Sequence, residues 1–229
     1  MIKWNTVKYI DCMDEMEGLP SLPDKSIDLC ITDPPYNQDF SGLSLKTTSL
    51  KRKNRMILYS DKKDFYKEWC YSWFEQLKRI CHQIIFTPGY NNRQIWFEKE
   101  NFELLIWVNM LRQGASKISY LNKYEMIFCF KIKNRFKMSV FKYNFGGDYI
   151  KDIKTIHPCP KPIKLWEWLI KTIKPKSVID PFIGSGTTAE VCTKLDIPWL
   201  GYEVNEVYSQ DIDKRLNNCK KEPQQTTLF

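Results

Sequence analysis

The stretch 32–37 constrains the fold more than any other part of the sequence, because it forms the rigid end of a strand. The residues before it, 26–31, form a short apolar run that predicts a buried strand. The two prolines that follow cannot donate to a sheet ladder and restrict the backbone, so the strand must stop there. The strand tip therefore presents one carboxylate, one carbonyl of fixed direction and one aromatic ring, which belong to Asp33, Pro34 and Tyr36.

Strand and helix patterns alternate over most of the chain. Within 64–80, aromatic and apolar residues recur every four positions, which is typical of a helix packed on a core. The alternation predicts a single α/β domain over residues 1–229, with a doubly wound, mainly parallel seven-stranded sheet. The expected strands are 6–10, 26–31, 83–87, 102–109, 124–132, 177–179 and 199–203. The expected helices are 13–19, 64–80, 92–100, 162–174, 187–195 and 205–218. The segment between the fourth and fifth strands has no helical period, which allows these two strands to pair antiparallel.

A glycine loop lies between the strand at 177–179 and the helix at 187–195. Gly184 and Gly186 let the backbone approach a ligand closely, and the start of the helix offers unpaired N–H groups. Glu203 ends the next strand, where an acid commonly binds ribose hydroxyls. The loop lacks the third glycine of a dinucleotide site and the lysine of a triphosphate site. The pattern therefore argues against a dinucleotide and against a triphosphate as the ligand.

Two basic segments dominate the charge distribution. Residues 46–63 hold seven Lys or Arg and one Asp, and residues 131–164 hold nine Lys or Arg and two Asp. Together they carry +13 in a chain of net charge +8, so the remainder carries −5. Basic segments on an otherwise acidic chain are typical of a surface that binds a polyanion. We expect base recognition by the basic, aromatic segment 134–156, and phosphate contacts from the polar loop 38–60.

Other function classes are disfavoured by composition. The eight cysteines form no CxxC pair and lie partly in apolar runs, which indicates reduced core thiols in an intracellular protein. The two histidines have no partner pair in the sequence, so we expect no metal site. No apolar run is long enough to span a bilayer, and residues 1–4 do not begin a signal peptide, so we expect no contact with a membrane.

The motifs together resemble those of the DNA amino-methyltransferases, which methylate the exocyclic amine of adenine or cytosine. Asp33-Pro34-Pro35-Tyr36 is similar to their catalytic motif, and its aspartate-first form is most similar to that of the adenine-N6 enzymes. The stretch 180–188 resembles their S-adenosylmethionine motif, and 201–203 resembles their ribose motif. The stretch 157–162 resembles a His-Pro-x-x-Lys-Pro segment that helps to close the cofactor loop. The catalytic motif precedes the cofactor motif, as in the β-type order of the family.

The resemblance implies a Rossmann-like methyltransferase fold and S-adenosylmethionine as the cofactor. Asp11 matches the family's adenine-recognition acid, although an N-cap for a helix from Cys12 onwards explains this residue equally well. The implied catalytic residues are Asp33, Pro34, Pro35 and Tyr36. The implied cofactor-binding residues are Asp11, Cys12, Asp33, Pro34, His157, Lys161, Pro162, Asp180, Pro181, Phe182, Gly184, Ser185, Gly186, Thr187, Thr188, Glu203, Val204 and Asn205. The expected nucleic-acid contacts are Lys46, Lys51, Arg52, Lys53, Arg55, Lys133, Arg135, Lys137 and Lys142.

The resemblance predicts a cytoplasmic enzyme of prokaryotic or phage type that transfers a methyl group to adenine N6 in a short sequence of double-stranded DNA. Cytosine N4 stays an alternative, because the motif holds an amine without specifying its ring. Methylation of RNA or of a protein amide, and a non-catalytic DNA-binding protein with this fold, are further alternatives. The recognition segment is short, which is compatible with a homodimer whose two subunits recognise the target sequence together. A cognate restriction endonuclease is an open question at this stage.

Overall fold

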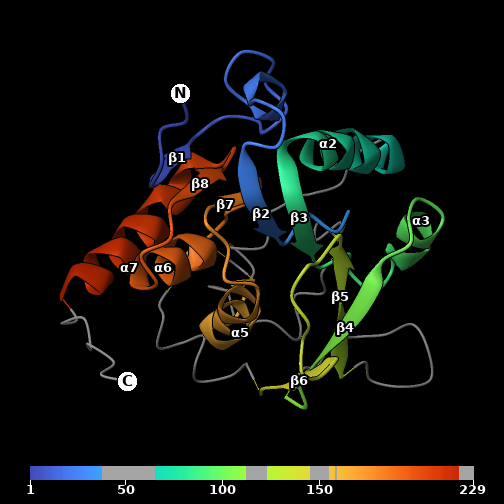
Figure 1. Cartoon of the computed structure of the whole chain (residues 1–229). Helices are drawn as coiled ribbons and strands as arrows, with labels where there is room; N and C mark the ends of the chain where they lie inside the picture. The colour runs from blue at the N-terminus through green and yellow to red at the C-terminus, as the bar shows by residue number, and fades with distance from the viewer. Residues whose placement is uncertain (38–64, 112–122, 145–154, 158, 222–229) are drawn as a thin grey trace, which may run out of the picture.

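The computed structural model describes residues 1–37, 65–111, 123–144, 155–157 and 159–221 (Figure 1). The strands are β1 (Thr6–Lys8), β2 (Ile27–Thr32), β3 (Cys81–Phe86), β4 (Glu103–Val108), β5 (Tyr124–Phe130), β6 (Val140–Lys142), β7 (Val178–Asp180) and β8 (Trp199–Tyr202). The α-helices are α2 (Tyr66–Ile80), α3 (Arg93–Phe97), α5 (Ile163–Ile173), α6 (Thr187–Lys194) and α7 (Ser209–Lys221). Two short 3₁₀ helices are η1 (Leu19–Ser21) and η2 (Glu206–Tyr208). None of the helices in these ranges is both long and apolar enough to cross a membrane.

One mixed sheet runs through the molecule in the order β1-β8-β7-β2-β3-β5-β4-β6. Only the pairings of β5 with β3 and with β4 are antiparallel, and the others are parallel. The predicted α/β class and mainly parallel sheet are therefore confirmed, as is the antiparallel pairing of the fourth and fifth strands. The sheet has eight described strands rather than the seven expected. The additional strand, β6, lies within the basic segment 134–156, where no strand was predicted, and pairs with β4.

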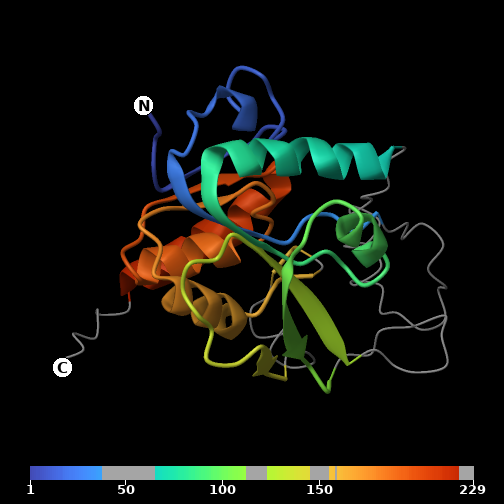
Figure 2. The same cartoon turned by 45° about the vertical axis from the view of Figure 1, so that its right-hand side comes forward.

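Helices cover both faces of the sheet, as Figures 1 and 2 show. Neighbouring residues of β2 point to opposite faces: Cys30 packs in the cluster that contains α2, and Leu29 and Ile31 pack in the cluster that contains α5 and α6. On the α2 side, the predicted aromatic stripe is buried at Trp73. Phe65, which the pattern placed in the same stripe, is exposed because it precedes the helix and has a left-handed backbone.

Several element boundaries differ from the sequence prediction. The helix expected at 13–19 does not form. The chain there turns instead, with the Asp11 and Asp14 side chains accepting backbone N–H groups, and only η1 follows. The helix expected at 92–100 shortens to α3, and the final helix begins as η2 before continuing as α7. The loop 38–60 lies outside the described residues, as do residues 145–154 of the recognition segment and most of the tail.

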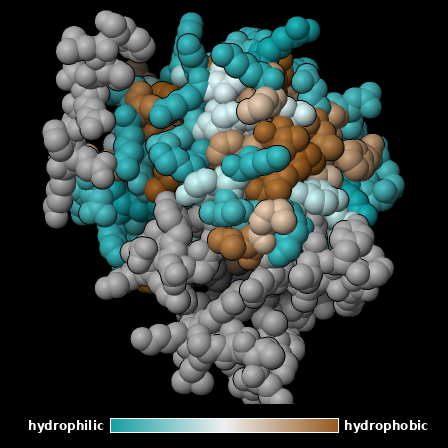
Figure 3. Space-filling view, turned by 90° about the horizontal axis from the view of Figure 1, so that it is seen from below, coloured by the Kyte–Doolittle hydropathy of each residue, from teal (hydrophilic) through white to brown (hydrophobic). Residues whose placement is uncertain are grey.

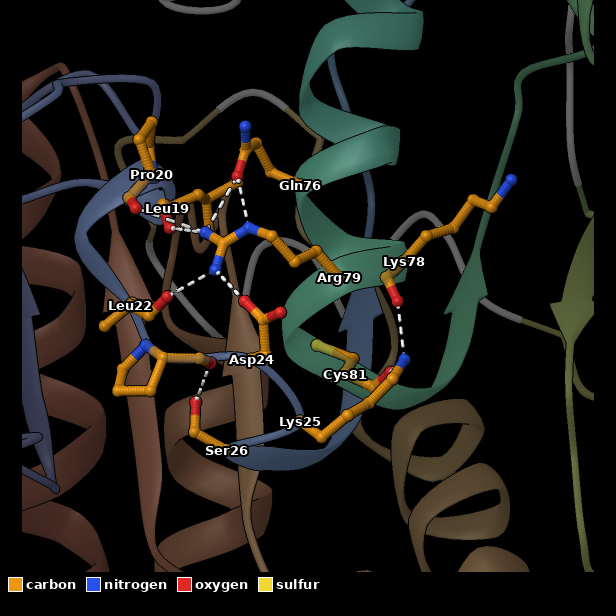
Figure 4. Close-up of polar contacts among 11 residues, drawn as sticks. Leu19, Pro20, Leu22, Asp24, Lys25, Ser26, Gln76, Lys78, Arg79 and Cys81 are labelled. Atoms are coloured by element: carbon orange, nitrogen blue, oxygen red, sulfur yellow. Dashed lines mark hydrogen bonds and ion pairs between the residues drawn. The ribbon is translucent and has the colours of Figure 1, made fainter.

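Arg79, near the end of α2, fixes the loop that leads into β2 (Figure 4). Its guanidinium donates to the carbonyls of Leu19, Pro20 and Leu22 at 2.7–3.2 Å, and to the side chains of Asp24 and Gln76 at 2.7–3.0 Å. Lys25 supports the same corner by donating to the Lys78 and Cys81 carbonyls at 2.6 and 2.9 Å. This corner holds the start of β2, the strand that carries Asp33 at its other end.

We expect Arg79→Met to lower the free energy of unfolding by about 2 kcal/mol, because three part-buried carbonyls lose a charged donor. Asp24 is 74% exposed, so loss of the ion pair itself contributes little. Urea unfolding of the variant tests this, with Lys67→Met, on an exposed ion pair of the same helix, as the control. Equal stability of the two variants would show that the Arg79 contacts do not stabilise this corner.

Candidate active site at the carboxyl edge of the sheet

The carboxyl ends of five adjacent parallel strands meet at one edge of the sheet, which faces downward in Figure 1. Glu203, Asp180, Asp33 and Thr87 lie at or directly after the ends of β8, β7, β2 and β3. The chain order reverses between β7 and β2, where open α/β sheets bind their ligands. Figure 3 views the molecule from this side, and apolar side chains gather there among hydrophilic ones.

Three donors converge on a single oxygen of the Asp33 carboxylate. The hydroxyls of Tyr36 and Thr87 donate to Oδ1, and the Lys161 ammonium lies 3.0 Å from the same atom. The second oxygen, Oδ2, accepts no hydrogen bond from the described part of the chain, and the Asp33 side chain is 21% exposed. Oδ2 is therefore open to a donor on a ligand.

Lys161 connects Asp33 to a second carboxylate. Its ammonium lies 2.9 Å from Glu125 Oε2 and donates to the Tyr36 hydroxyl at 3.0 Å. Burial alone would lower the pKa of Lys161, but Asp33 and Glu125 raise that pKa well above its usual value. Burial raises the pKa of Asp33, while Lys161 lowers it and Glu125 raises it. Two carboxylates and one ammonium leave one net negative charge at the strand tip.

The backbone after Asp33 is held in a fixed direction. Tyr66 donates to the Pro35 carbonyl at 2.6 Å, and Asn92 donates to the Tyr36 carbonyl at 2.9 Å. The Pro34 carbonyl receives no hydrogen bond from the residues that the structure describes. The Tyr36 ring rests on Gly89, where a Cβ would lie 2.9 Å from the ring, and burial raises the Tyr36 pKa well above its usual value. The phenol therefore stays neutral and acts as a donor.

The glycine loop after β7 requires its glycines. Gly184 and Gly186 have φ values of 52° and 81°, in the left-handed region that favours glycine. A Cβ at position 184 would lie 3.0 Å from His157 Nε2, and one at 186 would lie 2.9 Å from Ile212 Cγ1. Thr187 then begins α6, so the first N–H groups of this helix lie next to the loop.

Glu203 connects this loop to the end of β8. Its Oε2 accepts the Gly184 N–H at 3.0 Å, and its Oε1 accepts the Asn205 N–H at 2.8 Å. Burial raises the pKa of Glu203, and these two N–H bonds lower it. A carboxylate has about four acceptor positions, so hydroxyl donors of a ligand have room to bind here as well.

Other residues expected at the cofactor site have structural partners. Both oxygens of buried Asp180 are occupied, by the hydroxyls of Thr32 and Thr188 and by the Phe182 N–H, and burial raises its pKa to about 6. The Phe182 ring packs on α2. Ser185 lies 3.4 Å from the buried Arg215 guanidinium, which pairs with Glu190. Thr188 also accepts from a tryptophan Nε1 of α5 at 2.7 Å. Pro181, Pro162 and Thr187 are buried beside this loop.

The segment that contains His157 is anchored to α7. The Asp211 carboxylate accepts the N–H groups of Ile156 and His157 and the hydroxyl of Thr155 at 2.5–2.9 Å. The His157 ring packs on Tyr208, and burial lowers the His157 pKa to about 4, so the ring is neutral. These contacts hold His157 against Gly184.

The remaining candidates differ in their exposure. The Asp11 carboxylate accepts the Met13 N–H at 2.9 Å, so it caps a turn, and the Cys12 side chain is buried in the core. Val204 is exposed, and Asn205 caps η2. Lys133, Arg135, Lys137 and Lys142 are all exposed around β6. Lys46, Lys51, Arg52, Lys53 and Arg55 lie outside the described residues.

Sequence reasoning missed Thr87, Glu125 and Asp211. Thr87 follows the predicted strand 83–87, and its position at the end of a parallel strand was a usable signal. Glu125 reaches the site because β5 runs antiparallel to β3, which brings the start of β5 to the edge where β3 ends. The sequence around Asp211 gives no signal that its carboxylate binds residues 155–157, because these contacts depend on how α7 packs.

The doubly wound sheet, with the Asp33 strand end beside a glycine loop, has the architecture of the Rossmann-like methyltransferase fold. Residues 131–214 match a family model described as DNA methylase. The type II methyltransferase M.HinfI of Haemophilus influenzae is 28% identical over 260 residues, which cover 98% of this chain and 72% of that one.

Solved structures agree with this classification. PvuII DNA methyltransferase, a cytosine-N4-specific enzyme, superposes with a TM-score of 0.65 at 18% identity, over 94% of this chain and 90% of that one. The crystal structure of an M1.HpyAVI–SAM complex gives a TM-score of 0.59 at 20% identity, over 93% and 99%. Over nearly its whole length the chain is therefore similar to DNA methyltransferases, one of which is solved as a complex with S-adenosylmethionine.

The loop fits this cofactor. Its two left-handed glycines leave no space for a Cβ, the positive end of α6 suits a carboxylate, and the acid of Glu203 suits ribose hydroxyls.

Proposed function

We propose that the chain transfers a methyl group to the exocyclic N6 amine of adenine in double-stranded DNA. One observation carries the proposal: the Asp33 tip combines an accessible carboxylate oxygen, Oδ2, with a Pro34 carbonyl that no described residue occupies. An exocyclic amine has two N–H groups, so these two acceptors match its donors. The catalytic motif begins with an aspartate, Asp33, and this form of the motif favours adenine over cytosine as the target base.

The proposed mechanism relies on positioning. Asp33 Oδ2 and the Pro34 carbonyl each accept one N–H, which holds the nitrogen pyramidal, takes its lone pair out of conjugation with the ring and makes the amine a better nucleophile. The Tyr36 ring, which lies against Gly89, stacks on the base in this proposal. S-adenosylmethionine would supply the electrophilic methyl group: its bond to sulfur would break as the bond to nitrogen forms, leaving a thioether, and the methylated amine would then release one proton. In a duplex the target base must first be flipped out, because its amine is otherwise paired.

The cofactor is held, in this proposal, by residues on both sides of the glycine loop. Gly184 and the first turn of α6 face its methionine carboxylate, Glu203 accepts its ribose hydroxyls, and Asp11 binds its adenine. His157 and Pro162 close the loop. Asp180 fixes the start of the loop by accepting hydrogen bonds from Thr32, Thr188 and Phe182.

We expect Glu203→Ala to weaken S-adenosylmethionine binding by about 1–3 kcal/mol, because ribose hydroxyls would lose their acceptor. Isothermal titration calorimetry measures this directly. Glu206→Ala, an exposed acid three residues on, serves as the control. Unchanged affinity in Glu203→Ala would mean that Glu203 only holds the Gly184 backbone.

DNA binding is assigned to the two basic segments of this single domain. In the described part of segment 134–156, Phe136 and Phe141 pack on Trp168 of α5 at 5.1 and 4.9 Å between ring centroids. The basic side chains around β6 remain exposed, which supports a base-reading role for an anchored insert. Relatives named as type II methyltransferases support a role in restriction and modification, with a cognate endonuclease as a partner.

Changing Lys51, Arg52, Lys53 and Arg55 to Gln should weaken binding to all DNA sequences about equally. Phosphate contacts carry no sequence information, so the preferred sequence should stay the same. The slope of log K against log salt should flatten by about 0.9 for each phosphate that the loop no longer neutralises. Fluorescence anisotropy over a salt series measures both quantities. An altered sequence preference with an unchanged slope would place base reading in this loop instead.

Cytosine N4 is the second candidate, because the PvuII enzyme, whose fold is similar, is cytosine-N4-specific. Its amine would use the same two acceptors.

The substrate class is tested with purified chain and methyl-labelled S-adenosylmethionine. We expect label in unmethylated duplex DNA and none in RNA or in protein. Label in RNA or protein alone, or cofactor binding without transfer to any of them, would refute the proposal.

A further inference from the structure

We propose that Lys161 and Glu125 are positioning residues for the catalytic carboxylate: Glu125 holds the Lys161 ammonium, and the ammonium fixes Asp33 Oδ1 so that Oδ2 faces the target amine. The inference rests on the proposed methylation of a base amine. It gives Lys161 a place beside Asp33 in addition to its expected place at the cofactor loop.

The contacts of Lys161 support this assignment. An ammonium has three donors, and Nζ has three acceptors within 3.0 Å: Asp33 Oδ1, Glu125 Oε2 and the Tyr36 hydroxyl. The side chain is only 10% exposed, so these partners replace most of its water. Its backbone carbonyl meanwhile accepts from Thr187 Oγ1 at 3.2 Å, at the start of α6. One residue therefore connects the catalytic tip to the cofactor loop through separate groups.

The charges explain why two carboxylates surround one ammonium. Positive charge develops on the amine nitrogen during methyl transfer, and one net negative charge at the tip stabilises it. Without Glu125, Lys161 would neutralise Asp33 and weaken Oδ2 as an acceptor. Without Lys161, two carboxylates would face each other, and Asp33 would take up a proton more readily.

The two residues should therefore shift the titration of Asp33 in opposite directions. The titratable or charged groups that face Asp33 are Lys161, Glu125 and Tyr36, with Asp180 on the neighbouring strand. The Asp180 pKa responds to burial, to its hydrogen-bond donors and to Asp33. Loss of the signal in D33N therefore has to distinguish Asp33 from Asp180.

The test is a ¹³C NMR titration of the DNA-free chain, labelled at the aspartate side-chain carboxyls, with the Asp33 signal assigned by its loss in D33N. In K161M the midpoint should move to higher pH, and in E125Q to lower pH. The double variant should return toward the wild-type midpoint. K67M and E98Q, which alter an exposed ion pair, should leave the midpoint unchanged. Midpoints that move in the same direction, or not at all, would overturn the inference.

Kinetics on duplex DNA provide the second readout. Both variants should lower kcat by at least about tenfold, as expected for a disturbed transition-state interaction, while the Kd for S-adenosylmethionine stays within about twofold. Reduced cofactor affinity with unchanged kcat would also overturn the inference. If the wild-type chain methylates no DNA, the proposed function fails, and the NMR shifts still decide whether the pair controls Asp33.

Discussion

Asp33→Asn should reduce methyl transfer by at least about 100-fold while the fold survives. The substitution keeps the shape of the side chain but removes the negative charge that faces the reacting nitrogen. Removal of one preorganised electrostatic contact costs about 10²–10³ in rate in other enzymes. Single-turnover transfer from labelled S-adenosylmethionine to duplex DNA measures the loss.

Asp28→Asn is the matched control, because Asp28 lies on the same strand but toward its other end, where it accepts the Lys176 N–H at 2.9 Å. This variant should retain normal turnover. Some loss of cofactor affinity in Asp33→Asn is compatible with the assignment, since the tip borders the loop. Near-normal turnover in Asp33→Asn would remove Asp33 from the catalytic role.

Gly184→Ala should weaken S-adenosylmethionine binding by at least about tenfold. A left-handed backbone costs a residue with a Cβ about 1–2 kcal/mol, and the added Cβ would also crowd the His157 ring at 3.0 Å. Both effects push the loop away from the geometry that suits the cofactor. Calorimetry measures the affinity, and urea unfolding in the absence of cofactor measures the stability.

The double variant Gly184→Ala/His157→Ala separates the two causes. Removal of the ring relieves the crowding but not the backbone strain, so Gly184→Ala should cost less cofactor affinity in the His157→Ala background than in the wild type. Cofactor affinity of Gly184→Ala equal to that of the wild type would show that the loop tolerates a Cβ and that its glycines are not required.

The features that the sequence predicted well are local ones. The end of β2 at Asp33 follows from two prolines, and the glycine loop lies between a strand and a helix that are adjacent in sequence. The parallel pairing of these strands follows from their alternation with helices. The two motifs therefore come together at one edge of the sheet, although Asp33 and Asp180 are 147 residues apart in the sequence.

The features that were missed depend on long-range arrangement. Glu125 reaches Lys161 only through the antiparallel register of β5, in which Phe128 lies opposite Phe86. β6 is three residues long and forms only because β4 offers a free edge in the described sheet. Residues 13–19 have a helix-like composition, but the Asp11 and Asp14 side chains bind backbone N–H groups and favour turns instead.

Nucleoside mass spectrometry of DNA from a methylation-deficient host that expresses the chain tests the central claim most directly. The account predicts N6-methyladenine in the host DNA, and its absence when the host expresses Asp33→Asn. N4-methylcytosine in place of N6-methyladenine would contradict the assignment to adenine, and the absence of both modified nucleosides would contradict the proposed DNA methylation itself.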